Sequence, residues 1–354
     1  MSINTDYKTA VELTGAAQAA AEAFESSMPL TQWLPPKQNP TLMYEFDASD
    51  TTSVDVAQYR AFDTPAPYGL LGPKITKEGK LPPISRKLPV SEYTQLQWAD
   101  KLDQLGTLLE EYAAKLGVGI AARLEIARVE AVTTGRVTLD ENGIRATIDY
   151  GRDPALTLPL PAKTKRWNTA GALPVDDLIR WRDQVKKTSH GSLPTTIMLS
   201  NAVMNTLAQN AQIIAYALGR TDNLPGRVSA QHVRDVLAGY AGIGNVIIAD
   251  DAYSGFNFGR SVWPDGTVVL LPPTGVINID GQGLGSTSYG VTAEAIQPDY
   301  GIAANEQAGI FAAAFGHPDP EGLDVLASAV ALPLLQRANT TLGAQVITTE
   351  EDND

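Results

Sequence analysis

A long run of apolar residues at helical spacing, from Trp98 to Thr134, constrains the fold of this chain more than any other stretch. Successive apolar positions fall about 3.6 residues apart, which is the period of one helix face. A helix over this run would be roughly 55 Å long at 1.5 Å per residue, about three times the usual helix length. Its predicted packing residues are Leu105, Leu109, Tyr112, Leu116, Ile120 and Leu124. A rod of this length is unusual in a compact enzyme and suits a protein that spans a wall.

The predicted helix leads directly into a β-hairpin. Apolar residues alternate with polar ones on both sides of Asn142-Gly143, a pair suited to the positive φ angles of a type I′ turn. Gly117 and Gly119 lie in the middle of the helix, where each glycine costs about 1 kcal/mol relative to alanine. These two glycines predict a bend in the rod.

Composition excludes several classes of protein. The net charge of −13 argues against a dominant role in binding nucleic acid, which needs clustered Lys and Arg. The chain has no cysteine, which excludes disulfides, thiolate metal sites and cysteine nucleophiles. No signal peptide is visible, and no apolar run approaches the ~20 residues needed to cross a bilayer. We therefore expect a soluble protein made in the cytoplasm.

The first 40 residues are predicted to form an arm. Thr5 can cap an alanine-rich helix with a narrow apolar face, and Trp33 offers one large side chain for docking. Two interpretations stay open: a frayed terminal helix, or an arm that packs on a neighbouring subunit.

Residues 41–94 are predicted to form a long projecting loop. Strand-like runs at 42–46, 54–62 and 84–90 are separated by a tip rich in Pro and Gly. Such a loop has no core of its own and should rest on another surface. An ordinary surface loop is the alternative.

The rest of the chain reads as a mixed α/β region followed by apolar β segments. After the connector 153–167, helices are predicted from Pro174, from Asn201 and over 228–240, with strands at 195–200, 245–250, 260–262 and 267–271. The segments 324–331 and 334–337 are predicted to return to the sheet of the hairpin. The acidic tail 350–354 reads as a solvated end.

No set of residues predicts a catalytic, cofactor-binding or metal site. His190, His232 and His317 belong to no ligand motif. The carboxylate pair Asp176-Asp177 suits a helix N-terminus, and Asp250-Asp251 follows a strand. Both pairs are better interpreted as structural, so we predict that the protein is not an enzyme and needs no cofactor.

Several short stretches carry a resemblance to a known family. They are the helix and strand pair at 123–151, Trp167 with the Pro-Val-Asp-Asp-Leu helix start at 174–178, Met198-Leu199-Ser200-Asn201 with the later strand 245–250, and Trp33-Leu34-Pro35 after the arm. In these features the chain resembles the lambda-type major capsid proteins of tailed bacteriophages, the major capsid protein E family, over about residues 30–345. The match is most specific at 123–178.

The resemblance implies an α+β chain with the Hong Kong 97-type phage capsid fold. Under that fold, 1–40 is the N-terminal arm, 41–94 the extended loop and 95–166 the peripheral domain with the spine helix and hairpin. Residues 167–290 are then the axial domain, and 291–354 return to the peripheral domain and end in the acidic tail.

The resemblance also implies function and partners. Copies of the chain would form hexamers and pentamers of an icosahedral head, assembled in the host bacterial cytoplasm, that encloses double-stranded DNA without sequence-specific binding. Expected partners are a decoration protein, a scaffolding protein and a portal, with no membrane. The residues predicted to contact neighbouring subunits are Trp33, Tyr59, Arg60, Phe62 and Tyr68. We predict no covalent crosslink, because no asparagine partner is identifiable for Lys74, Lys77 or Lys80.

Two alternatives accompany this interpretation. A cargo-enclosing nanocompartment of the encapsulin type would share the fold. A soluble α/β enzyme or binding protein with long insertions would belong to another class, and would require a convergent polar pocket that the sequence does not predict.

Overall fold

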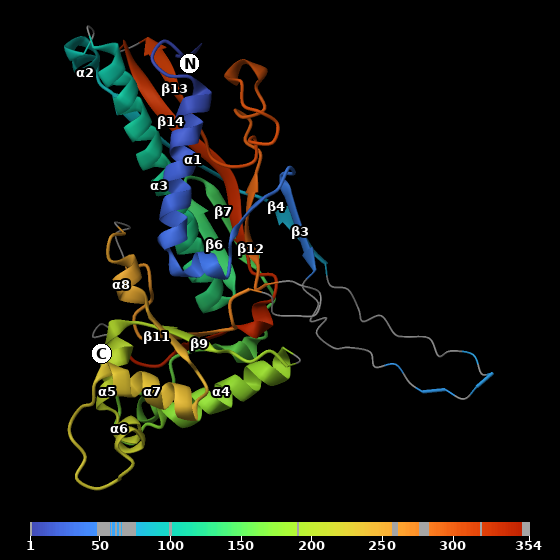
Figure 1. Cartoon of the computed structure of the whole chain (residues 1–354), viewed down its shortest axis with the longest axis vertical. Coiled ribbons are helices and arrows are strands. Elements are labelled where there is room, and N and C mark those ends of the chain that lie inside the picture. Colours follow the sequence, from blue (N-terminus) through green and yellow to red (C-terminus); the bar gives the residue numbers. More distant parts are fainter. Residues whose placement is uncertain are drawn as a thin grey trace. The chain divides into compact units, whose positions relative to one another are not determined.

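The computed structural model describes residues 2–47, 57, 59–60, 62–63, 65, 76–98, 101–189, 191–256, 261–275, 283–318 and 321–348 (Figure 1). The chain separates into two compact units. Unit 1 contains residues 1–45, 78–129 and 285–334, and unit 2 contains 46–77, 130–284 and 335–354. The predicted five-segment division of the chain stays a prediction.

Unit 1 is built on a six-stranded sheet. Its longest strand, β14 (Glu321–Leu334), pairs antiparallel with three strands, β13 (Phe311–Pro318), β5 (Pro83–Val90) and β12 (Ser286–Gly290). The sheet ends at β1 (Ser2–Ile3) beside β13, and at β2 (Pro36–Gln38), which runs parallel to β12. The prediction that 324–331 return to the sheet of the hairpin is wrong, because β14 finds three partners within unit 1.

Two long helices cover this sheet. In unit 1, α1 (Ala10–Ser27) lies beside α3 (Leu102–Thr134) (Figure 1), and both contribute to one core with Leu13, Leu109, Leu116 and Val325. The predicted rod is confirmed with its C-terminal end at Thr134, but it begins four residues later than Trp98. The preceding residues form a separate helix, α2 (Glu92–Gln97), because Ser91 caps a new N-terminus and Trp98 ends it.

The N-terminal helix also starts later than predicted. Thr9, and not Thr5, caps α1: the Thr9 hydroxyl accepts from Glu12 N and the Glu12 carboxylate accepts from Thr9 N, a complete capping box. A 3₁₀ turn, η1 (Pro29–Gln32), follows α1. Another, η4 (Pro298–Tyr300), precedes β13.

Unit 2 contains a five-stranded mixed sheet in the order β10 (Asn245–Ile248), β9 (Thr196–Leu199), β11 (Thr267–Leu271), β15 (Leu342–Gln345) and β8 (Thr157–Leu158). Its helices are α4 (Pro174–Thr188), α5 (Asn201–Gln209), α6 (Ala211–Leu218), α7 (Ala230–Tyr240) and α8 (Ala249–Tyr253), with 3₁₀ turns η2 (Pro154–Leu156), η3 (Lys163–Lys165) and η5 (Ala338–Thr340). The helix start at Pro174 is confirmed: proline occupies the first position, Asp176 and Asp177 the first turn, and Leu178 is buried.

Four predictions in unit 2 are corrected. The helix from Asn201 is two helices, since the Asn210 side chain accepts from Gln212 N and starts a second one. Strand β10 is not buried, because it lies at the sheet edge. Ser261 and Val262 are not in a strand, and the predicted segment 334–337 gives way to β15, which pairs with β11.

Two small sheets complete the described residues. Strands β6 (Arg136–Glu141) and β7 (Ile144–Asp149) form the predicted hairpin, with φ of 47° at Asn142 and 87° at Gly143, as a type I′ turn requires. Strands β3 (Met43–Asp47) and β4 (Thr76–Lys80) form a second pair. Most of the predicted strand 54–62 and of the loop tip lies outside the described residues.

Candidate functional site

The N-terminal helix docks on the sheet and long helix of its own unit. Leu13, Ala17 and Ala21 on α1 are buried, and the Thr14 hydroxyl both accepts from Ala312 N and donates to Ala312 O, each at 3.0 Å, on β13. The apolar face of α1 therefore has a partner within its own chain, unlike either expectation for the arm.

Gly117 lets α1 and α3 approach closely. A Cβ at this position would collide with the backbone carbonyl of Ala17, whereas a Cβ at Gly119 would have open space around it. Helix α3 continues through both glycines. Gly117 thus has a packing role that the sequence did not reveal, and the predicted bend stays a prediction.

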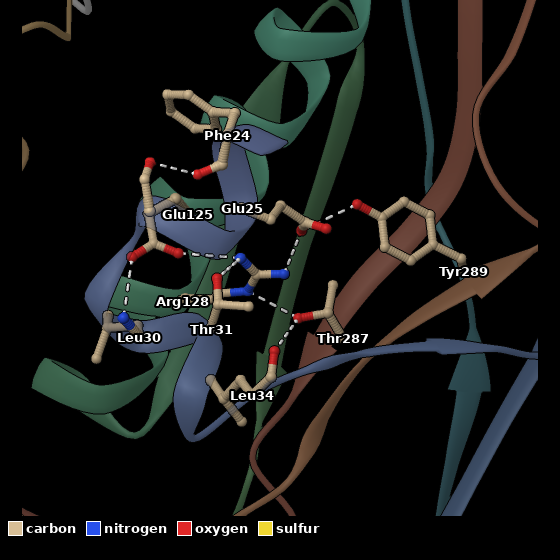
Figure 2. Close-up of polar contacts among 10 residues, drawn as sticks. Phe24, Glu25, Leu30, Thr31, Leu34, Glu125, Arg128, Thr287 and Tyr289 are labelled. Carbon is tan, nitrogen blue, oxygen red and sulfur yellow. Dashed lines mark hydrogen bonds and ion pairs between the residues drawn. The ribbon is translucent and has the colours of Figure 1, made fainter. Parts of the chain in front are cut away.

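A buried arginine on the same long helix joins three segments that are distant in sequence (Figure 2). The Arg128 guanidinium on α3 donates to Glu25 Oε1 on α1 at 2.5 Å and to Glu125 Oε2, one turn earlier on α3, at 3.0 Å. It also donates to the hydroxyls of Thr31 in η1, at 2.9 Å, and Thr287 in β12, at 2.8 Å. All three nitrogens of the guanidinium are therefore bound.

A second set of hydrogen bonds extends this cluster. Tyr289 Oη donates to Glu25 Oε1 at 3.1 Å, Glu125 Oε1 accepts from Leu30 N at 3.4 Å, and the Thr287 hydroxyl donates to Leu34 O at 2.9 Å. We call Glu25, Thr31, Glu125, Arg128, Thr287 and Tyr289 the Arg128 cluster. It fixes the N-terminal segment to the long helix and to the sheet.

Burial and charge act in opposite directions in the cluster. Burial alone would lower the pKa of Arg128, but the carboxylates of Glu125 and Glu25 outweigh it and raise the pKa, so the guanidinium stays charged. Burial, and then the negative charge of Glu25, raise the pKa of Tyr289 well above the usual value of a tyrosine. The side chains of Arg128 and Glu125 are fully shielded from solvent, so this ion pair joins parts of the fold inside unit 1.

A different arginine caps the C-terminus of α3 in unit 2. Arg152 is buried and donates to the carbonyls of Ala131, Val132 and Thr133 and to the Thr341 hydroxyl. The last carbonyls of a helix lack helical partners and carry partial negative charge. Burial lowers the pKa of Arg152 to about 9, which leaves it cationic at neutral pH.

The residues predicted to line the long helix belong to the core of unit 1 or pack against it. Leu105, Leu109, Leu116, Ile120 and Leu124 are all 2% exposed or less, and Tyr112 packs against the same core while half-buried. Their role in packing the rod of an assembled coat stays a prediction.

The five predicted intersubunit residues differ in exposure. Trp33 is only 2% exposed. Tyr59 and Phe62 are fully exposed, at 108% and 98%, whereas Arg60 makes an interaction of its own. Tyr68 lies outside the described residues. A role for any of them between subunits stays a prediction.

The described part of the chain contains no group of three or more His, Asp or Glu side chains placed to hold a metal ion. His232 bonds to its own helix cap, Ser229, at 2.7 Å, His317 lies 3.8 Å from Asp324, and His190 is outside the described residues. Within those residues, no helix is both long and apolar enough to span a bilayer.

Comparison with known proteins identifies the family of this chain. The family described as phage major capsid protein E matches residues 37–346. The chain belongs to this family. It is a capsid protein of a phage, and its fold is the Hong Kong 97-type coat fold.

Solved structures agree with the fold. The putative capsid protein of an Escherichia coli CFT073 prophage is 15% identical, with a TM-score of 0.56 over 93% of this chain and 99% of that one. A phage-related protein of Bordetella bronchiseptica RB50 is 12% identical, with a TM-score of 0.52 over 93% and 95%. The comparison with curated proteins found no significant match.

The Arg128 cluster was missed at the level of sequence. Its usable signal was the position of Arg128, four residues after Leu124, which continues the buried stripe Leu116, Ile120, Leu124. A charge that continues an apolar stripe predicts a buried ion pair. The partners on α1 and β12 are about 100 and 160 residues away, and no local pattern identifies them.

Proposed function

We propose that copies of this chain close into an icosahedral head of hexamers and pentamers that encloses double-stranded DNA. The family match over residues 37–346 carries the proposal. The match supports a structural role, so we propose that the chain has no catalytic activity and no cofactor.

Coat subunits of this kind join through heterologous contacts, which close into rings when the rotation between copies allows. The fully exposed aromatic rings of Tyr59 and Phe62 support a contact with another copy, since exposed aromatic side chains commonly anchor interfaces. An acidic chain, with a net charge of −13, would also adhere weakly to the DNA it encloses.

Further partners belong to the same proposal. A scaffolding protein, a portal and a decoration protein would act with the coat, and assembly would take place in the host bacterial cytoplasm before the head becomes part of the virion. The lysines of the loop would form no covalent link between subunits.

The test is sedimentation of the purified chain, expressed alone and together with the neighbouring genes of its phage. Particles many times heavier than the 37.7 kDa subunit are expected, and nuclease-protected DNA is expected in particles made with the phage genes. A persistent monomer would contradict the shell, whereas shells filled with a protein cargo would favour a nanocompartment.

A further inference from the structure

The β6–β7 hairpin has two chemically different faces. The register pairs Val137 with Ile148 and Leu139 with Ala146 on the apolar face. On the polar face it pairs Arg136 with Asp149, Thr138 with Thr147 and Asp140 with Arg145. Only Val137 of this hairpin is fully buried, and an isolated two-stranded sheet is at best marginally stable in water. Among the described residues, no third strand pairs with the hairpin to stabilise it.

The two edges of the hairpin differ. In a two-residue hairpin, backbone groups that point away from the partner strand belong to alternate residues, here Arg136, Thr138 and Asp140 on β6 and Arg145, Thr147 and Asp149 on β7.

The outer edge of β6 is largely closed by side chains. Glu130 accepts from Thr138 N at 2.9 Å, and the Thr134 hydroxyl bonds to both Arg136 N and Arg136 O. These contacts confirm which backbone groups point outward.

The outer edge of β7 is open. At its far end Lys77 Nζ donates to Asp149 O at 2.8 Å, and a carbonyl can accept a second bond. Among the described residues no strand pairs with this edge, and Arg145 and Thr147 are exposed. An exposed, regular edge strand is a template for pairing with another chain.

The sequence of β7 is complementary to itself in one antiparallel register. Centring a two-fold axis on Thr147 places Arg145 of each copy opposite Asp149 of the other, and Thr147 opposite Thr147. The polar face of the four-stranded sheet then has three rows. The two outer rows alternate in charge, reading Arg136, Asp149, Arg145, Asp140 across the four strands, and the middle row consists of threonines. Cross-strand pairs of opposite charge and of threonines are favourable. Centring the axis on Arg145 would oppose two arginines, and centring it on Ala146 would leave Arg145 opposite a threonine.

We propose that β7 is a two-fold contact between copies of this chain, forming a continuous four-stranded sheet β6-β7-β7-β6. The contact is isologous, so both copies use the same residues. The apolar face then places Ala146 opposite Ile148 of the other copy on both sides of the axis. This proposal rests on the shell function, because the second copy is a neighbour in the assembled coat.

A cysteine crosslink tests the register, because the chain has no cysteine of its own. Hydrogen-bonded antiparallel partners have Cα atoms about 5.5 Å apart, which a disulfide can bridge. Particles carrying Thr147→Cys should give covalent dimers on a non-reducing gel after mild oxidation.

Two matched variants are controls. Thr138→Cys replaces the threonine directly opposite on the same exposed face, but the two copies would be three strand spacings apart, about 14 Å, and should stay monomeric. Arg145→Cys should also stay monomeric, and dimers from it would instead show the arginine-centred register and overturn the proposal.

The outcomes separate this contact from the shell function. If the wild-type chain makes no particles, the shell function fails; if particles form and Thr147→Cys gives no dimer, the β7 contact fails. Should Thr147→Cys itself not assemble, particles made from a mixture of Arg145→Cys and Asp149→Cys chains decide. Dimers in that mixture, and in neither variant alone, support the contact, and their absence contradicts it.

Discussion

Gly117 on α3 lies directly against the backbone of Ala17 on α1, so that a single added methyl group would collide with the Ala17 carbonyl. This contact makes a glycine necessary in the interior of a 33-residue helix, where its intrinsic cost is about 1 kcal/mol. The close approach of the two helices stabilises unit 1 and offsets the lower helix propensity of glycine.

Gly117→Ala is therefore expected to destabilise the folded chain. Overpacking typically costs about 1–3 kcal/mol, which exceeds the gain in helix propensity. Gly119→Ala is the matched control, because its added methyl group meets no atom and should stabilise by up to about 1 kcal/mol. Denaturant unfolding of both variants measures the difference, and equal midpoints would contradict the packing role.

Breaking the Arg128 cluster should cost more than breaking an exposed ion pair. Arg128→Met leaves Glu25 and Glu125 buried without their cation, and removing one partner of a buried pair typically costs about 3–5 kcal/mol. Arg145→Met breaks a pair with Asp140 whose side chains are 86% and 69% exposed, and should change stability little.

A compensated variant separates charge from packing at this cluster. Converting Glu25 and Glu125 to Gln in the Arg128→Met background removes the unpaired carboxylates, and most of the lost stability should return. If the triple variant were as unstable as Arg128→Met, the cost would lie in packing and not in uncompensated charge.

Tyr289 should make stability depend on pH only under alkaline conditions. Its pKa in the folded chain lies above the usual value, which is about 10 in an unfolded chain. Below about pH 10 both states keep the phenol proton, so Tyr289 adds no pH dependence there. Above it the unfolded chain loses the proton first and stability falls as pH rises.

Tyr289→Phe lacks this titration. The stability advantage of the wild-type chain over Tyr289→Phe should be constant from neutral pH to about pH 9 and should shrink above pH 10. Unfolding of both chains across that range gives the answer, and an advantage that stays constant to pH 11 would show that Tyr289 titrates normally.

The long helix should be required for assembly. Leu116 is 2% exposed in the middle of α3, where proline removes a hydrogen bond and clashes with the preceding turn, at a cost of about 3 kcal/mol or more. Leu116→Pro should yield no particles, whereas Leu116→Met keeps volume and helix propensity and should assemble normally. Normal particles from Leu116→Pro would contradict the role of α3 in assembly.

Local patterns in the sequence predicted much of this fold. The 3.6-residue period predicted α3 to its last residue, Asn142-Gly143 predicted the hairpin, and the Pro and Asp residues at 174–177 predicted the start of α4. Each of these signals acts within a few residues, so it is readable without knowledge of the partner surface.

The features that failed are those that depend on distant partners. Helix α1 is held in place by a close approach to Gly117 on α3 and by the hydrogen bond from Thr14 to Ala312 on β13. Both partners lie far away in the sequence. The sheet that contains β14 is set by its pairing with β5, β12 and β13. Alternation within a strand shows which face is apolar, but does not identify the neighbouring strand.

The most direct measurement of the central claim is single-particle electron microscopy of the purified chain at the resolution of its helices. A closed shell is predicted, with one copy of the 33-residue α3 visible in every subunit and the subunits grouped in pentamers and hexamers. Isolated monomers under all conditions of concentration and salt, or a fixed small oligomer that never closes, would contradict the assignment of this chain as the coat of a phage head.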